Sequence, residues 1–275
     1  MTTRAGQRLR AVCAVLATLV LAACLIAPGG FTSELDIRKD GRFTYSYAGT
    51  IHLLPLNPAA GSFTPKPFAP ACMTETGSDR PCSSAEIAEQ KAAWQSSQAF
   101  AQRQLQSMKV VMGGIDLSSP EAGVQLSERL RGQAGWKRVE YQGGGRFLVD
   151  FSLSGRLDHD FAFPSIEQMP MMNAFVRISA RKDGSVRIDA PGFDAGASSG
   201  AMRAMGASLT GNPHDGRADG FPRIDGTFAL RTDGVIVANN ADGGPRPDPA
   251  GRRLDWRITQ ETPAAPMAEI RLLRP

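Results

Sequence analysis

The residues of this chain that could do chemistry are few and lie far apart in the sequence. Residues 196–200 read GASSG and match the G-x-S-x-G pattern of serine hydrolases. In those enzymes an acid and then a histidine follow the nucleophilic serine. His214 is the only later histidine, and no Asp or Glu lies between Ser198 and His214. We therefore interpret the match as a product of a segment rich in Gly, Ala and Ser.

A second candidate is Asp158-His159-Asp160, whose side chains could bind a metal ion or carry a proton. On a β-strand the two carboxylates would point to one face and the imidazole to the other. His52 and His214 lie in unrelated contexts, and the chain has no His-x-x-x-His or Cys/His ligand spacing. We expect solvated polar residues at the start of a strand and predict no metal site.

Soft thioether ligands are the third candidate. Met169, Met171 and Met172 lie close together, and Met202 and Met205 are three residues apart. Thioethers select Cu(I), but methionine also fills irregular gaps in protein cores, and we favour the core interpretation. No P-loop or Rossmann glycine motif is present, so we predict no cofactor. Carboxylate pairs for glycoside hydrolysis form only in space, so the sequence neither supports nor excludes them.

The start of the chain has the layout of a bacterial secretion signal. Three arginines form a basic head, an apolar run follows over residues 11–20, and the chain then reads LAAC at 21–24. The apolar stretch 11–27 is at the short limit for a membrane span, which needs about 20 residues. An uncleaved membrane anchor, or ordinary secretion with cleavage elsewhere, is the alternative.

The LAAC tetrad resembles the lipobox of bacterial lipoproteins, in which the cysteine is acylated and becomes the new N-terminus. The resemblance implies that residues 1–23 are a signal peptide and that Cys24 carries the lipid, with a short tether over residues 24–32. Several acyl chains would hold the protein on a bilayer, at about 0.8 kcal/mol per buried methylene. Leu25 follows the cysteine where an Asp could stand, which in enterobacterial lipoproteins goes with export to the outer membrane. We therefore expect the periplasmic face of that membrane.

Cys72 and Cys82 remain after the signal is removed, because Cys13 lies within it and Cys24 is the lipid site. An even pair in an exported protein predicts a disulfide, worth about 2–3 kcal/mol in the chain-entropy model. Redox pairs usually have the spacing Cys-x-x-Cys, whereas nine residues separate these two. We therefore predict that this disulfide is structural.

The net charge of +4 comes largely from the signal, which holds three of the 31 Lys and Arg residues and no acidic residue. The rest of the chain is close to neutral. A nucleic-acid-binding domain would show a basic patch or stripe, and none is visible. We expect no nucleic-acid partner.

The elements that must position these residues are mostly β-strands. Asp-Gly pairs at 40–41, 183–184 and 233–234 each lie between runs of alternating apolar and polar residues, a strong hairpin signal. Clean alternation also indicates antiparallel sheet with one buried face. The pattern predicts hairpins over 33–49, 175–189 and 224–237, a longer one around Gly143–Gly145, and further strands near 161–163, 254–258 and 268–272.

Two helices interrupt the strands. Ser83 and Glu86 have the spacing of a capping box, and apolar residues from Ile87 to Met112 recur at helical spacing before Gly113-Gly114. A second start signal is Pro120 in the tolerated first turn. We predict helices over about 84–112 and 120–133, packed on one face of the sheet.

Three segments carry a wider resemblance: FTSELDIRKDGRFTYSYAGTIHLL at 31–54, GRLDHDFAFPSIE at 155–167 and RRLDWRIT at 252–259. With the LAAC tetrad they resemble a group of uncharacterised alphaproteobacterial lipoproteins, a resemblance that implies no known activity. The strand, Asp-Gly, strand pattern just after the lipid cysteine is also remotely similar to the LppM-type domain of mycobacterial lipoproteins. That second resemblance implies a lipid-interacting role and assigns no residue.

These observations predict a single α+β domain over residues 33–275, a mostly antiparallel sheet built from hairpins with two helices on one face. The predicted function is that of a membrane-anchored envelope lipoprotein, a non-enzymatic binding module for a hydrophobic ligand or an envelope protein. The alternatives are an exported hydrolase with an unrecognised site and a purely structural envelope protein. A deep apolar pocket would favour a ligand, and an exposed apolar patch would favour a protein partner.

Overall fold

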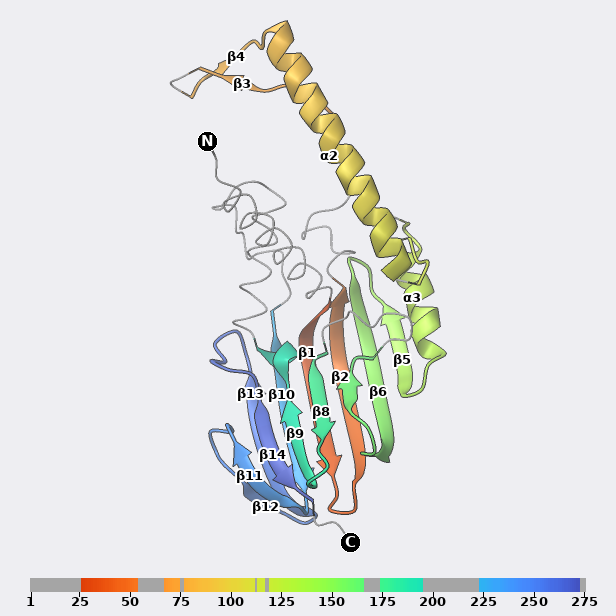
Figure 1. The fold of residues 1–275 in the computed structure, drawn as a ribbon, viewed down its shortest axis with the longest axis vertical. Coiled ribbons are helices and arrows are strands. Elements are labelled where there is room, and N and C mark those ends of the chain that lie inside the picture. Colours follow the sequence, from red (N-terminus) through yellow and green to blue (C-terminus); the bar gives the residue numbers. More distant parts are fainter. Residues whose placement is uncertain are drawn as a thin grey trace, which may run out of the picture.

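The fold is mostly β-sheet: two sheets pack face to face, with two helices at one end (Figure 1). The computed structural model describes residues 26–53, 67–74, 77–111, 113–116, 119–165, 174–194 and 223–272. The predicted α+β class, with mostly antiparallel strands, is therefore confirmed. The second layer differs from the prediction, since a second sheet covers most of the buried face where helices were expected.

The larger sheet has seven strands, which are antiparallel except where β1 and β10 run in parallel. In spatial order they are β12 (Arg246–Asp248), β13 (Gly251–Ile258), β10 (Asp225–Thr232), β1 (Ile26–Ile37), β2 (Arg42–Leu53), β6 (Arg146–Arg156) and β5 (Trp136–Tyr141).

The smaller sheet has five antiparallel strands. In spatial order they are β11 (Val235–Asn239), β14 (Met267–Arg271), β9 (Ser185–Asp189), β8 (Val176–Ala180) and β7 (Phe161–Phe163). A 3-10 turn, η3 (Pro191–Phe193), follows β9 and carries Phe193 into the space between the sheets.

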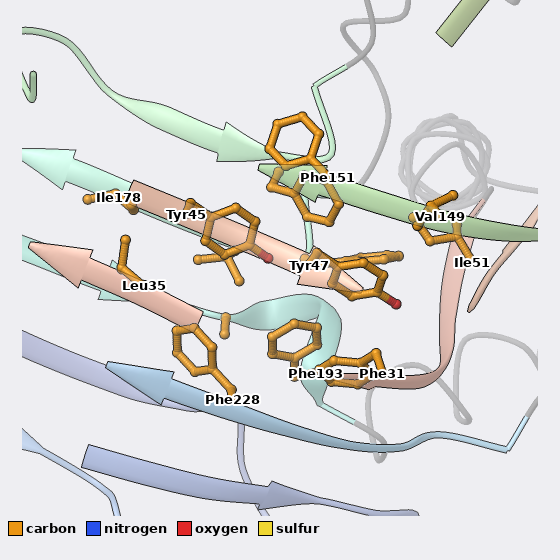
Figure 2. Packing of buried hydrophobic residues seen from close by; sticks show 14 of the residues in the cluster. Phe31, Leu35, Tyr45, Tyr47, Ile51, Val149, Phe151, Ile178, Phe193 and Phe228 are labelled. Atoms are coloured by element: carbon orange, nitrogen blue, oxygen red, sulfur yellow. The ribbon is translucent and has the colours of Figure 1, made fainter. Parts of the chain in front are cut away.

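Aromatic side chains fill the space between the two sheets (Figure 2). Phe163 from the smaller sheet lies among aromatic rings of the larger one. Its ring centroid is 5.0 Å from that of Tyr45, 5.1 Å from Tyr47 and 4.7 Å from Phe151. Rings at these distances contribute attraction beyond the area that they bury. The alternating residues of both sheets therefore share one core.

The hairpins with turns at 40–41, 143–145 and 183–184 are confirmed by the strand pairings of β1 with β2, β5 with β6, and β8 with β9. The hairpin predicted over 224–237 is wrong. β10 pairs in the larger sheet and β11 in the smaller one, so the Asp233-Gly234 turn carries the chain from one sheet to the other. The chain does bend at Asp233-Gly234, but Gly234 lacks the positive φ that Gly41 and Gly184 have. Alternation does not say which sheet the next strand joins.

The folded part of the chain starts earlier than predicted. Strand β1 begins at Ile26, inside the stretch 24–32 that was expected to be a tether, and Ile26 pairs with Leu53 at the end of β2. Ile26, Ala27 and Phe31 are buried. The reason is that apolar residues on both sides of Pro28 can still pack into the core across an irregularity in the ladder between Pro28 and Phe31.

The two predicted helices form over nearly the expected residues but differ in packing. α3 (Ala122–Arg131) buries Leu126 and Leu130 and lies against β5. α2 (Ser84–Val111) projects past the end of the sheets (Figure 1). Among the side chains of α2 that the structure describes, none is buried. The prediction that both helices pack on the sheet therefore fails for the described part of α2.

Candidate binding surface on the helical arm

The most unusual feature of the molecule is the helical arm, defined here as α2 with the disulfide hairpin β3 (Cys72–Met73) and β4 (Asp79–Arg80) at its N-terminal end. α2 has 28 residues, which at 1.5 Å per residue is about 42 Å. Figure 1 shows the hairpin at the tip of α2, far from the two sheets. The arm therefore extends beyond the two packed sheets and α3, which together are called the body below.

A disulfide between Cys72 and Cys82 closes the hairpin, with the two Cα atoms 5.3 Å apart. Next to it, Ser83 and Glu86 form the predicted capping box. The backbone N–H of Ser83 donates to the Glu86 carboxylate at 2.9 Å, and the N–H of Glu86 donates to Oγ of Ser83 at 3.3 Å. Arg80 adds an ion pair with Glu86. These contacts fix the hairpin to the first turn of α2.

Side chains further along α2 contact the same segment. The Gln90 side-chain amide accepts from the Ala71 N–H and donates to the Ala71 carbonyl, both at 3.0 Å. The rings of Phe68 and Trp94 lie 5.9 Å apart. The start of the predicted apolar stripe of α2 thus faces residues 68–71 and not the sheet. Sequence reasoning missed this packing because no pattern in residues 67–74 indicates a partner.

Elsewhere on the arm, large apolar side chains lie in solvent. Phe100 is 65% exposed and Val110 is 79% exposed, and Met73 on the hairpin is 63% exposed. Phe100 and Val110 are ten residues apart, which at 3.6 residues per turn is within about 80° around the helix. Exposed apolar side chains that share one side of an unpacked helix are typical of a protein-binding surface.

The end of α2 is anchored to the body of the protein. The N–H of Gly114 donates to the Lys109 carbonyl at 2.7 Å, the helix-ending pattern predicted for Gly113-Gly114. Arg129 on α3 donates to the Gly113 carbonyl at 2.9 Å, and Lys109 forms an ion pair with Asp116. The base of the arm is therefore tied to α3, and α3 to the sheet.

The body offers little internal room for a ligand among the described residues. A hollow of about 20 Å³ lies between α3 and the sheet, lined by apolar side chains that include Ile26, Leu130 and Trp136. That volume is about what a single water molecule needs. The deep apolar pocket that would favour an enclosed hydrophobic ligand is thus not found in this part of the chain.

The polar candidates from the sequence do not form a reactive site. Asp158 and His159 contact each other in an exposed position, while Asp160 turns away and accepts from the Ala180 N–H at 3.2 Å. Across the described ranges, no group of three His, Cys, Asp or Glu side chains could hold a metal ion. Cys24, residues 196–200, His214 and the five methionines between 169 and 205 lie outside the described residues.

Three titratable groups are perturbed by burial and not by a reactive neighbour. Burial raises the pKa of Tyr45 and Tyr47, whose hydroxyls lie 3.0 Å from Oγ of Ser33 and 2.8 Å from the Thr50 carbonyl. Burial, with the nearby charge of Arg146, lowers the pKa of His52. The tyrosines therefore stay protonated as core residues and supply no proton carrier to a cleft.

Comparisons with known proteins add a remote similarity. No protein-family model and no curated protein matches the chain. Among solved structures, the chain is similar to the folded domain of LppM from Mycobacterium tuberculosis, determined by NMR. The identity is 12%, the match covers 90% of this chain and 94% of that one, and the TM-score is 0.31. Within the described residues, no helix combines the length and apolarity that crossing a membrane requires.

Proposed function

We propose that the protein is a membrane-anchored lipoprotein of the cell envelope, acylated at Cys24, that acts as a non-enzymatic binding module. Its binding surface is the helical arm, and its ligand is another envelope protein. The observation that carries this proposal is the exposure of Phe100 and Val110 on a helix without a buried described side chain. Burying one such side chain against a partner contributes about 1.5–3 kcal/mol.

The position of β1 supports the anchor. Ile26 begins β1 two residues after Cys24, and two extended residues span about 7 Å. Ile26 lies beside α3 in the small apolar hollow, at the end of the body from which the arm projects. A lipid on Cys24 would hold that end near the bilayer, so that the arm samples partners at the membrane. We further propose the periplasmic face of the outer membrane.

An enclosed hydrophobic ligand is the less favoured alternative. The apolar hollow beside α3 is about 20 Å³, whereas pockets for small molecules are about 300–1,000 Å³. The exposed apolar residues lie on the outside of the arm and not around a cavity. The small volume of the hollow and the exposed position of the apolar residues therefore favour a protein partner that covers the arm over a lipid held inside the body.

Two measurements test the proposal. Metabolic labelling with palmitate should mark the protein, and Cys24→Ala should lose the label; label retained in that variant overturns the anchor. For the arm, a photo-crosslinking residue at position 100 should give a discrete adduct with one envelope protein in cells, which Val110→Asp weakens. The same probe at Lys137, an exposed residue on β5, is the control. Equal adducts from both positions, or none at position 100, would contradict binding by the arm.

A further inference from the structure

A second hollow lies at the opposite end of the body from the arm. Its volume is about 220 Å³, and it lies where the β1–β2 turn, the end of β6, the β8–β9 turn and the residue after β14 come together. This is the junction of the tips of the two sheets. Backbone atoms of two tight turns therefore form part of its wall.

Three cationic side chains line this hollow: Lys39 from the β1–β2 turn, Arg156 at the end of β6 and Arg181 from the β8–β9 turn. Neither Lys39 nor Arg156 forms an ion pair with a described carboxylate, and Arg181 reaches Glu269 only at 3.8 Å. Elsewhere on the sheets, arginines such as Arg187 and Arg138 bind a neighbouring carboxylate at 2.7 Å. The cations of the hollow are thus available to a ligand.

Hydrogen bonds hold the walls in place before any ligand arrives. The Leu157 N–H donates to the Gly41 carbonyl at 2.8 Å, and the Leu272 N–H donates to the Gly184 carbonyl at 2.9 Å. Nη2 of Arg156 donates to the Asp40 carbonyl at 3.0 Å. This last bond orients the guanidinium and leaves its other donors free. A preformed site loses less conformational entropy on binding.

Two acidic residues, Asp40 and Asp158, also line the hollow. The Asp40 carboxylate is already occupied by Arg42, whose N–H donates at 3.0 Å and whose Nε donates at 2.7 Å. The backbone hydrogen bond from Arg42 is the main reason that the pKa of Asp40 is lowered, and Arg156 contributes least. Asp158 contacts His159.

Glu269 lies 3.8 Å from Arg181, and Asp233 accepts from the Lys39 N–H at 2.6 Å, so four carboxylates lie around the three cations. Recognition of an anion therefore has to come from hydrogen bonds donated by Arg156 and Lys39 more than from net charge.

We propose that this hollow binds a phosphoryl group, with Arg156 and Lys39 as the main donors and Arg181 as a third. A phosphoryl group carries about −1.5 to −2 charges at pH 7 and three acceptor oxygens, and the planar guanidinium of arginine matches its geometry. The inference goes beyond the proposed function and does not depend on it. A lipoprotein with both sites would hold one ligand at the membrane and another on the far side.

Inorganic phosphate, titrated into the full-length protein as it is isolated, is the probe. At constant ionic strength we expect saturable shifts of the amide resonances of Gly41 and Gly184. Arg156→Gln should weaken binding about tenfold, as expected for loss of a hydrogen bond to a charged group. Lys39→Gln should also weaken it. Both side chains are exposed at the tips of the sheets, so neither substitution should disturb folding.

Lys137→Gln is the matched control, because it removes one exposed positive charge from edge strand β5, opposite the middle of β6 and outside the lining of the hollow. It should leave the affinity for phosphate unchanged. Shifts that do not saturate, or an equal loss of affinity in the Arg156 and Lys137 variants, would overturn the site. Acetate binding as tightly as phosphate would overturn its assignment to a phosphoryl group.

Discussion

At the level of single residues, Glu86 connects the two parts of the arm. Its carboxylate accepts from the Ser83 N–H at 2.9 Å and from Nη1 of Arg80 at 3.0 Å, so it links the hairpin to the helix. An acidic side chain in the first turn of a helix also interacts favourably with the helix dipole. The hydrogen bond from Arg80, followed by those from Ser83, lowers the pKa of Glu86 to about 2.

This pKa predicts how the arm responds to acid. A carboxyl whose pKa is lowered in the folded state stabilises that state fully above its ordinary pKa of 4.5 and loses the contribution as the pH falls toward about 2. We expect the protection of amide protons in the first turns of α2, measured relative to the intrinsic exchange rate at each pH, to fall between these two pH values. Glu86→Gln should show lower protection at neutral pH and little further change in protection on acidification. An unchanged pH profile in that variant would show that another group controls the arm.

The residues of the arm also show which contacts spacing can reveal. The capping box was predictable because Ser83 and Glu86 are three residues apart and both side chains act locally. The Cys72–Cys82 pair was predictable from the expected export and from the even number of cysteines left after the signal. The contact between Gln90 and Ala71, and that between Phe68 and Trp94, depend on how a loop folds back in space. The spacing of residues in the sequence cannot predict contacts of this kind.

At the level of elements, the contact between α3 and β5 depends on the small size of Gly123. A Cβ atom added at Gly123 would lie 2.4 Å from ring atoms of Tyr141. Leu126 and Leu130 on the same helix are buried, so α3 cannot move away without exposing them. Gly123 therefore sets the distance between the helix and the sheet.

Gly123→Ala tests this packing against simple helix propensity. Propensity alone would stabilise α3 by about 1 kcal/mol. We expect instead a loss of about 1–3 kcal/mol in the free energy of unfolding, because overpacking forces side chains or backbone to shift. In a Tyr141→Ala background the same substitution should become neutral or stabilising. Urea unfolding of the four proteins of this cycle measures the coupling, and additive effects would exclude the clash.

The pairing of the elements was only partly predictable from the sequence. Turns such as Asp40-Gly41 and Asp183-Gly184 act on adjacent strands, and these hairpins formed as expected. Alternation shows that one face of a strand is buried but not what covers it. The second sheet, the parallel pairing of β1 with β10 and the passage through Asp233-Gly234 between sheets are all non-local. They were therefore absent from the prediction.

At the level of the whole molecule, the arm and the body should behave as nearly independent units. The described side chains of α2 bury nothing in the core, and its base is tied to the body through Gly113, Lys109 and α3. We expect that replacing residues 68–109 with a flexible Gly/Ser linker changes the free energy of unfolding of the body by less than about 1 kcal/mol. Urea unfolding followed by core tryptophan fluorescence would measure it. A larger loss would mean that the arm supports the body.

The parallel pairing of β1 with β10 also constrains the order of folding under the proposed export. β1 comprises residues 26–37 and its parallel partner comprises residues 225–232. Long-range pairing of this kind folds slowly. A chain that emerges from a translocation channel N-terminus first would carry β1 with one edge unpaired until nearly all the rest had emerged. Unpaired edges are templates for aggregation, so under the proposed export we expect the exposed edge of β1 to need protection until β10 has emerged.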